Sequence, residues 1–295
     1  MMDLIVQDQN GIIRTWLRGR LNGITQNQLD TLFFQNRILL NGSVSSPDSE
    51  IHKGDCITIH LREKLGIVAE NISFPTLFED DQLLIIDKPS GITVHPGLGH
   101  WSGSVLNGIQ YNIENGTLST KLKAEEMLVH RLDKGTSGVL ILAKNEEVRR
   151  ALMAQFVTNK IQKEYEALVN GIPKDNRGEI ELYIGRVPGD SYRFGWSLDK
   201  TYGKYSLTSY KVDEVYPNYS KLLLYPKTGR THQLRLHCLW LGHPILGDTR
   251  YIDKDSITHP CNRLALHASA LIFWHPVEKK EIKIKSPWPI ELNLE

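Results

Sequence analysis

The first 66 residues alternate short apolar clusters with polar positions, as a small folded unit does. Apolar side chains recur at helical spacing between Ile13 and Leu21, which predicts a first helix. A second helix is predicted to begin at Thr25, because a threonine followed three positions later by a glutamine, here Gln28, is typical of a capping box. Two helices are therefore expected near the start of the chain.

Short strands are predicted to follow these two helices. Residues 37–40 and 56–59 are rich in branched apolar side chains, as strands are. They are accompanied by an Asn41–Gly42 pair and a Lys53–Asp55 segment, both of which are typical of tight turns. The N-terminal stretch therefore combines helices with short strands.

A change in the length of the apolar runs divides the chain into two parts. Residues 63–71 are polar and contain a glycine, so they are the best candidate for a linker. From Phe74 onward the chain carries longer apolar runs separated by glycine and proline. We therefore expect one domain over residues 1–66, including the linker, and a second over residues 67–295.

Strand patterns outnumber helix patterns in the second part. Apolar runs at 83–86 and 138–144 are typical of buried strands, and residues 146–159 predict an amphipathic helix. The expected apolar face of that helix comprises Val148, Leu152, Met153 and Phe156. Further short strands are predicted at 165–169, 205–216, 219–226 and 281–285. The pattern predicts an α+β fold built on a mixed sheet.

Composition narrows the class of protein. The 295 residues are 40% hydrophobic and 23% charged, which is typical of a globular protein. The start has no basic region followed by an apolar stretch, and no segment approaches the roughly 18 apolar residues of a membrane span. Cys56, Cys238 and Cys261 are odd in number and far apart, which disfavours a disulfide framework. We expect a cytoplasmic protein that neither is secreted nor spans a membrane.

Charge points to an anionic ligand at one place only. The formal net charge is +1, so any binding of nucleic acid must depend on local charge. Residues 226–251 carry four basic residues (Lys227, Arg230, Arg235 and Arg250) and one acidic residue, Asp248. Such a cluster attracts phosphate groups, and RNA is the obvious candidate. The alternative is a solvated charged face, which the interleaved leucines of this segment disfavour.

The same segment contains residue types that can bind a metal ion. His232, His237, His243 and Cys238 lie close together in sequence, but their spacing matches no familiar zinc pattern. We therefore predict no metal.

Two further segments carry candidate chemistry. Asp133 precedes a Gly-Thr-Ser-Gly turn that leads into the apolar run at 138–144, so its carboxylate could be held at a strand edge and still face a cleft. The alternative is that Asp133 and Thr136 only cap a turn. Tyr165 stands between charged residues at the start of a predicted strand, where a tyrosine is more often part of a core or a sheet surface.

Taken together, these motifs resemble the RluA-type family of RNA pseudouridine synthases. The motifs LLIIDKPSGITVHPG, HRLDKGTSGVLILAK, KEYEALVNG, GRTHQLRLHCLWLGHPILGD and RLALHASALIFWHP occur in the order that this family shows. The resemblance covers about residues 74–289. Residues 10–62 resemble a degenerate S-four-type RNA-binding module, in which Gln and Asn replace the usual basic residues of the second helix.

The resemblance implies a fold, a reaction and four site residues. The implied fold is a central mixed, mainly antiparallel sheet flanked by helices and loops, with a small N-terminal α/β RNA-binding module. The implied activity is an isomerase that converts uridine to pseudouridine in structured RNA, either ribosomal or transfer RNA. It needs no cofactor or metal, and no DNA or membrane partner is expected. Asp133 is the implied catalytic residue, Tyr165 packs against the target base, Arg235 pairs with the aspartate and Arg131 helps to displace the base.

Two alternatives stay open at the level of sequence. One is an RNA-binding factor that keeps this fold and has lost catalysis, which the intact Asp133, Tyr165 and Arg235 disfavour. The other is a hydrolase of nucleosides or glycans, which needs a second carboxylate close to the first. Asp87 is the one local candidate for that second carboxylate.

Overall fold

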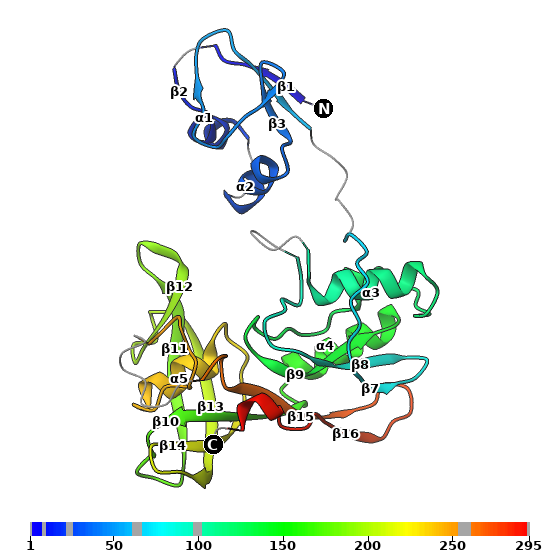
Figure 1. Cartoon of the computed structure of the whole chain (residues 1–295), viewed down its shortest axis with the longest axis vertical. Coiled ribbons are helices and arrows are strands. Elements are labelled where there is room, and N and C mark those ends of the chain that lie inside the picture. The colour runs from blue at the N-terminus through cyan, green and yellow to red at the C-terminus, as the bar shows by residue number, and fades with distance from the viewer. Residues whose placement is uncertain are drawn as a thin grey trace. The chain divides into compact units, whose positions relative to one another are not determined.

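Two compact units make up the chain. The computed structural model describes residues 2–7, 10–21, 26–60, 67–96, 102–252 and 261–293. The first unit comprises residues 1–68 and 96–101, and the second comprises residues 69–95 and 102–295 (Figure 1). Each unit contains a hydrophobic core of its own, and each is described separately below.

Short strands and two helices form the N-terminal unit. Its elements are β1 (Met2–Ile5), β2 (Gly11–Ile12), α1 (Ile13–Arg20), α2 (Gln26–Phe34), β3 (Ile38–Leu40), β4 (Ser43–Val44), β5 (Glu50–Ile51) and β6 (Cys56–Ile59). Four strands form an antiparallel sheet in the order β1-β6-β3-β4, and β2 pairs with β5. The predicted first helix and both predicted strands are confirmed. The pairing of β1 with β6 was not predicted, because four half-exposed residues carry too little pattern to reveal a strand.

Local chemistry explains the turn between β3 and β4. Asn41 and Gly42 both have positive φ angles, 51° and 81°. A two-residue hairpin turn of this kind requires positive φ at both central positions, and Asn followed by Gly adopts it most readily. The predicted turn is confirmed. The predicted capping box of α2 lies outside the described residues, since neither Thr25 nor the side chain of Gln28 is described.

One large sheet organises the second unit. Its strands are β7 (Thr76–Glu79), β8 (Leu83–Lys88), β9 (Ser137–Ala143), β10 (Gln162–Asn170), β11 (Arg177–Val187), β12 (Asp190–Ser197), β13 (Lys204–Val215), β14 (Tyr219–Pro226), β15 (Leu266–Trp274) and β16 (Glu281–Lys285). The order is β12-β11-β13-β14-β10-β15-β9-β8-β7, with β16 paired to β15. Only β9 and β15 pair in parallel among the described strands. The predicted α+β fold with a mixed, mainly antiparallel sheet is confirmed.

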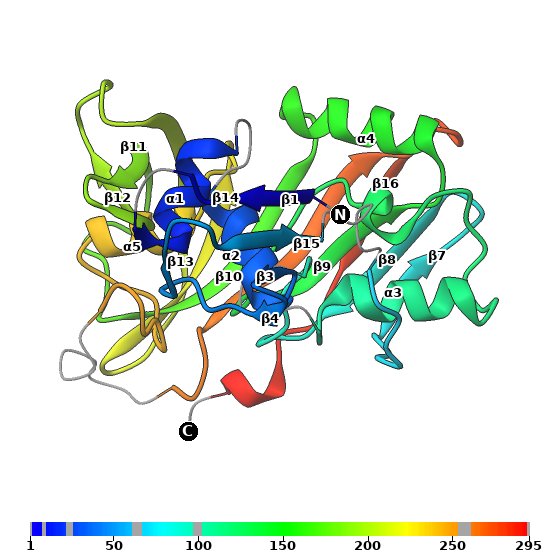
Figure 2. The same cartoon turned by 90° about the horizontal axis from the view of Figure 1, so that it is seen from above.

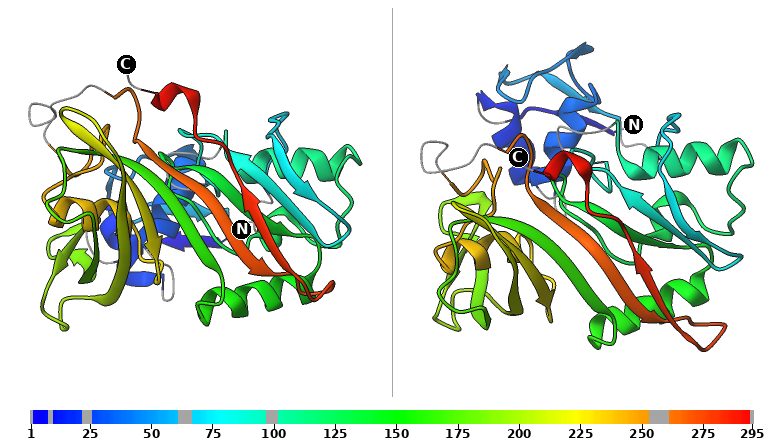
Figure 3. Two further views of the ribbon diagram at one scale, coloured as in Figure 1. Left: turned by 90° about the horizontal axis from the view of Figure 1, so that it is seen from below. Right: turned by 60° about the horizontal axis from the view of Figure 1, so that its bottom comes forward.

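Strand β15 connects two halves of this sheet, each with its own core. It is drawn in orange in Figure 3, between β10 and β9. Leu266, near its start, packs into the core of β10, β11, β13 and β14, whereas Leu271 and Phe273 pack into the core of β8 and β9. Strand β15 therefore contributes side chains to both cores, and residues from both halves of the sheet can meet beside it.

Helices cover the two halves differently. The helices are α3 (Val105–Glu114), α4 (Glu146–Val157) and α5 (Gln233–Trp240), and the short 3-10 helices are η1 (Ala124–Met127) and η3 (Ile290–Leu292). Helices α3 and α4 lie on the same side of the β8–β9 half, and α5 packs against β11 and β13 (Figures 1 and 2). The predicted helix α4 is confirmed, but its apolar face is narrower than expected. Val148 and Leu152 are buried, whereas Met153 is 40% exposed, because the helix contacts the sheet through a narrow stripe only.

Within the described residues, no helix is long and apolar enough to cross a membrane.

Gly138 allows β9 and β15 to approach each other. It has a φ angle of 111°, and a Cβ at this position would lie 2.2 Å from the carbonyl oxygen of Ala268 on β15. Gly138→Ala is therefore expected to cost about 2–4 kcal/mol of unfolding free energy, because both the backbone angle and the strand contact must change. Urea unfolding measures this loss.

Gly116→Ala is the matched control for this substitution. Gly116 has a φ angle of 80°, but its Cβ would meet open space. Only the conformational cost of about 1–2 kcal/mol should remain there. Equal losses for the two variants would show that the contact between β9 and β15 tolerates a methyl group.

Candidate active site

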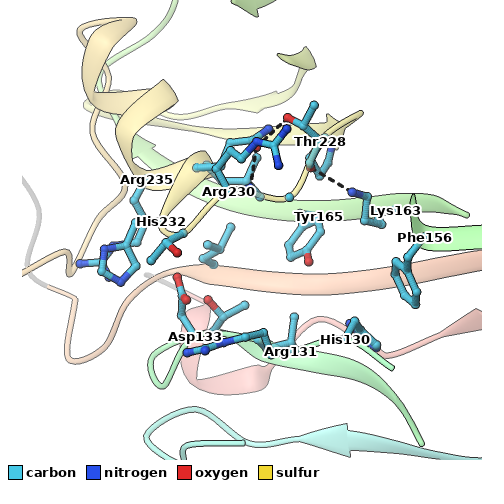
Figure 4. Close-up of a pocket in the computed structure, with 18 of the residues that line it drawn as sticks. His130, Arg131, Asp133, Phe156, Lys163, Tyr165, Thr228, Arg230, His232 and Arg235 are labelled. Atoms are coloured by element: carbon cyan, nitrogen blue, oxygen red, sulfur yellow. Dashed lines mark hydrogen bonds between the residues drawn. The ribbon is translucent and has the colours of Figure 1, made fainter. Parts of the chain in front are cut away.

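A cavity of about 530 Å³ opens where the two halves of the sheet meet. A cavity of this size is typical of a small-molecule or nucleotide site. Its walls come from the loop before β9, the C-terminal end of α4, strand β10 and the loop between β14 and α5 (Figure 4). All four residues that the sequence singled out line it, although they come from three distant parts of the chain: Arg131, Asp133, Tyr165 and Arg235.

The loop that carries Asp133 is fastened to a neighbouring loop. The ammonium group of Lys88 donates a hydrogen bond to the carbonyl of Lys134 at 3.4 Å, and also reaches two carbonyls of its own loop. The hydroxyl of Ser90 donates to the carbonyl of Gly135 at 2.7 Å. These bonds hold the backbone on the C-terminal side of Asp133, so its carboxylate is anchored although its side chain is only partly buried.

Lys88 was not predicted to contribute to the site. Its side chain is fully buried. Burial lowers its pKa to about 7, while the negative charge of Asp133 acts in the opposite direction. The sequence signal that could have identified Lys88 is a lysine at the end of a buried apolar strand. A buried ammonium group needs several hydrogen-bond acceptors, so such a lysine is expected to bind nearby loops.

Tyr165 presents an uncharged aromatic ring to the cavity. It lies on β10, opposite Leu224 of β14. Burial raises the pKa of its phenol, and the negative charge of Asp133 raises it further, so the hydroxyl stays protonated. Within the described part of the chain, that hydroxyl forms no hydrogen bond. Tyr165 therefore lines the cavity with an aromatic ring and an uncharged hydroxyl group.

Two substitutions of Tyr165 separate the role of its ring from that of its hydroxyl. The resemblance implies that this ring packs against a base. On that expectation Tyr165→Phe leaves turnover within about threefold of wild type, whereas Tyr165→Ala reduces it about ten- to hundredfold, because stacking is lost. The initial rate of the implied isomerisation of uridine measures both. Equal losses for the two variants would assign the role to the hydroxyl.

Arg235 forms an ion pair with Asp248. Its Nε and Nη2 atoms donate to the two carboxylate oxygens of Asp248 at 2.7 and 2.5 Å, and no hydrogen bond to Asp133 is present among the described residues. Asp248, 2% exposed, faces one edge of the guanidinium and accepts from two of its five N–H donors. The pairing of Arg235 with Asp133 that the resemblance implies stays a prediction.

Asp133 still interacts with Arg235 through space. Burial alone would lower the pKa of Arg235, but the hydrogen bonds and charge of Asp248, together with the charge of Asp133, raise it. The guanidinium also lies 4.9 Å from the centre of the Tyr251 ring. Arg235 thus remains a fixed positive charge near Asp133.

His232 also faces the cavity, whereas the sequence indicated it only as a possible metal ligand. It has a left-handed backbone (φ 55°) at the start of α5, and its Nδ1 lies 2.5 Å from the hydroxyl oxygen of Tyr251. Burial lowers its pKa, while the charge of Asp133 raises it. Its proximity to Asp133 depends on the turn before α5, which the sequence did not reveal. The described residues contain no group of three His, Cys, Asp or Glu that could hold a metal ion.

Asp133 is the only carboxylate among the described residues that line the cavity. Asp87 lies on β8 and is not part of the lining. A hydrolase that works through two carboxylates would need both groups about 5–10 Å apart across one site. The arrangement instead combines one carboxylate, the uncharged rings of Tyr165 and Phe156, and several cationic groups.

Comparison with known proteins agrees with this arrangement. A sequence model of the family described as RNA pseudouridylate synthase matches residues 82–240. An RNA pseudouridine synthase of Synechocystis sp. is 34% identical over 277 residues, which cover 93% of this chain and 84% of that protein. The ribosomal large subunit pseudouridine synthase D of Buchnera aphidicola is 34% identical over 283 residues, with coverage of 91% and 88%.

A solved structure adds the fold. The human protein RNA pseudouridylate synthase domain containing 1 superposes with a TM-score of 0.57 and 28% identity, over 73% of this chain and 83% of that one. Together with the sequence matches, this confirms the resemblance that the motifs indicated. The chain belongs to the RNA pseudouridylate synthase family, whose members are isomerases.

Proposed function

We propose that this chain isomerises uridine to pseudouridine in ribosomal RNA and that Asp133 is its essential carboxylate. One observation carries the proposal: among the described residues that line the cavity, Asp133 is the only carboxylate, and it acts electrostatically on both Tyr165 and Arg235. The choice of ribosomal RNA is supported by relatives named ribosomal large subunit pseudouridine synthase D.

The chemistry needs one ionised carboxylate close to the ribose. The bond from the anomeric carbon to a uracil nitrogen breaks, the ring turns, and a ring carbon forms the new bond. A carboxylate at that position either attacks the anomeric carbon or removes a neighbouring ribose proton. Arg235, held by Asp248, supplies a fixed positive charge near Asp133 for either route.

Uridine in folded RNA must leave its stack before this reaction. Extrusion costs a few kcal/mol, which contacts with the protein must offset. The ring of Tyr165 supplies an uncharged surface for the uracil. The side chain of Arg131 is exposed at the cavity, and its planar guanidinium is suited to occupy the place that the base has left.

The N-terminal unit is proposed to be an RNA-binding module. Helix α1 carries three arginines, of which Arg14 lies 3.5 Å from the carboxylate of Asp30, and Arg37 lies just before β3. We expect removal of residues 1–62 to weaken binding of structured RNA about tenfold, because several phosphate contacts are lost. Turnover of short RNA should be unchanged. Filter binding and initial rates measure the two effects, and unchanged binding would reduce this unit to a structural appendage.

Position-resolved mapping of pseudouridine tests the function. RNA from cells with the gene, without it, and with the Asp133→Asn gene is labelled with carbodiimide and read by primer extension. We expect sites in large-subunit ribosomal RNA that disappear in the deletion and return only with the intact gene. Sites that return with Asp133→Asn would reject the role of Asp133. The absence of any change in abundant RNA would favour an RNA-binding factor without catalysis.

A further inference from the structure

Three basic residues gather at the end of the cavity away from Asp133. Lys163 lies on β10, two residues before Tyr165, and Figure 4 shows it near Phe156 and Thr228. Arg230 lines the same cavity from the loop between β14 and α5, and Lys227 precedes it in that loop. We call Lys163, Lys227 and Arg230 the basic cluster.

No carboxylate neutralises the basic cluster within the described part of the chain. Lys163 donates to the carbonyl oxygen of Thr228 at 2.9 Å, and Arg230 donates to the carbonyl oxygen of Tyr205 at 2.8 Å. These acceptors carry no net charge. The neighbouring Glu164 does not compensate either, because it pairs with Lys283 at 3.0 Å.

The three charges repel one another in the free protein. Burial, together with the positive charges of Arg230 and Lys227, lowers the pKa of Lys163 to about 8. Grouping cations without a counter-ion costs free energy, and a bound anion relieves this cost. The cluster is therefore poised for a negatively charged ligand.

A second pocket adjoins the main cavity at the basic cluster. It measures about 240 Å³, shares Asn159, Lys163 and Pro226 with the main cavity, and has Glu164 and Lys227 in its wall. Lys163 therefore lines both pockets, and the basic cluster lies at the border between them.

We propose that the basic cluster binds a backbone phosphate of the RNA next to the target uridine. This inference rests on the proposed function, because it takes the base to lie on Tyr165. A phosphodiester supplies the missing negative charge, and charge-assisted hydrogen bonds from Lys163 and Arg230 hold it. The cluster thereby sets how far the extruded nucleotide enters the cavity.

A binding experiment tests the cluster without requiring turnover. The probe is a fluorescein-labelled oligouridylate of about 12 nucleotides, a length that covers a single-strand site. Lys163→Met should raise its Kd about tenfold at low salt, as expected for loss of a charge-assisted bond. It should also lower the slope of log Kd against log salt by about 0.7, the share of one phosphate on a single strand.

Two further variants keep this test decisive. Lys280→Met is the matched control, because Lys280 is an exposed lysine that pairs with Glu278 outside both pockets. It should leave the affinity and the salt slope unchanged. Lys227→Gln covers the case that Lys163→Met fails to fold, since Lys227 is exposed. It should act in the same direction as Lys163→Met, and a salt slope unchanged in both variants would overturn the proposal.

A second arm locates the phosphate. Short RNA with the mapped uridine is made with one uncharged methylphosphonate linkage beside it. That linkage should weaken binding to the wild type about tenfold and weaken binding to Lys163→Met by less, because the two changes act on the same contact. Independent, additive losses would show that the cluster binds elsewhere on the RNA. If the wild type modifies no RNA, the proposed function fails, and the oligouridylate arm still decides whether the cluster binds phosphate.

Discussion

Asp133→Asn is expected to abolish turnover, with a loss of about 10⁴-fold or more, while RNA binding stays at least as tight as in the wild type. Removing a group that reacts directly with the substrate causes losses of this order. Asparagine keeps the shape of the side chain and removes a negative charge that repels phosphate. The described cavity offers no second carboxylate that could substitute for it.

Two measurements on the purified protein check this result. Tritium released from the ring carbon that forms the new glycosidic bond reports turnover, and filter binding reports affinity. Weaker RNA binding with unchanged turnover per bound RNA would reject a chemical role for Asp133.

Asp87→Asn is the control for the carboxylate chemistry. Asp87 carries the same functional group on the adjacent strand β8, outside the cavity. Turnover of this variant should stay close to that of the wild type. An equal loss would instead support a mechanism with two carboxylates.

The second large effect is expected on stability. Asp248→Ala should reduce the free energy of unfolding by about 3–5 kcal/mol, because it leaves a buried guanidinium without its partner. The side chain of Arg235 is 11% exposed and that of Asp248 is 2% exposed, so water cannot replace the lost bonds fully. Asp248 also accepts hydrogen bonds from the backbone N–H groups of Arg250 and Tyr251, which would be lost as well.

Urea unfolding measures this loss, and an exposed ion pair supplies the control. Glu278 and Lys280 form a pair at 2.5 Å, with side chains 42% and 62% exposed. Glu278→Ala should cost at most about 0.5 kcal/mol, because solvent screens such a pair. A loss below about 1 kcal/mol for Asp248→Ala would mean that the pair with Arg235 contributes little to the fold.

Asp248→Ala should also reduce turnover. Without Asp248, Arg235 is no longer held in place, so the fixed positive charge near Asp133 is lost. Circular dichroism at the assay temperature separates this effect from unfolding. Full activity in a folded Asp248→Ala protein would remove Arg235 from the proposed mechanism.

The sequence by itself determined the features that depend on local chemistry. The apolar run at 138–144 predicted β9, and the Asn41–Gly42 pair predicted a hairpin turn, because hydrophobic periodicity and backbone preference act over a few residues. Asp133 and Tyr165 were singled out as site residues through the family resemblance of the motifs that contain them. The order of the motifs was sufficient to indicate the family.

Only the tertiary structure decided which side chains meet. The sequence did not reveal that Asp248 reaches the guanidinium of Arg235, because the two residues are brought together across a turn. The bond from Lys88 to the carbonyl of Lys134 spans 46 positions of the chain, and no local pattern reports such a contact. Periodicity tells which face of a strand is buried, but the register and order of the strands select each partner.

The chemistry of the cavity was decided in the same way. In the sequence, Asp87 was the one local candidate for a second carboxylate beside Asp133. The fold places Asp87 outside the lining of the cavity. The sequence showed Lys227 and Arg230 only as members of a charged segment. Lys163 lies on β10 and comes close to them only in the folded chain. Charge, burial and distance act between residues that are neighbours in space, so the tertiary structure had to supply them.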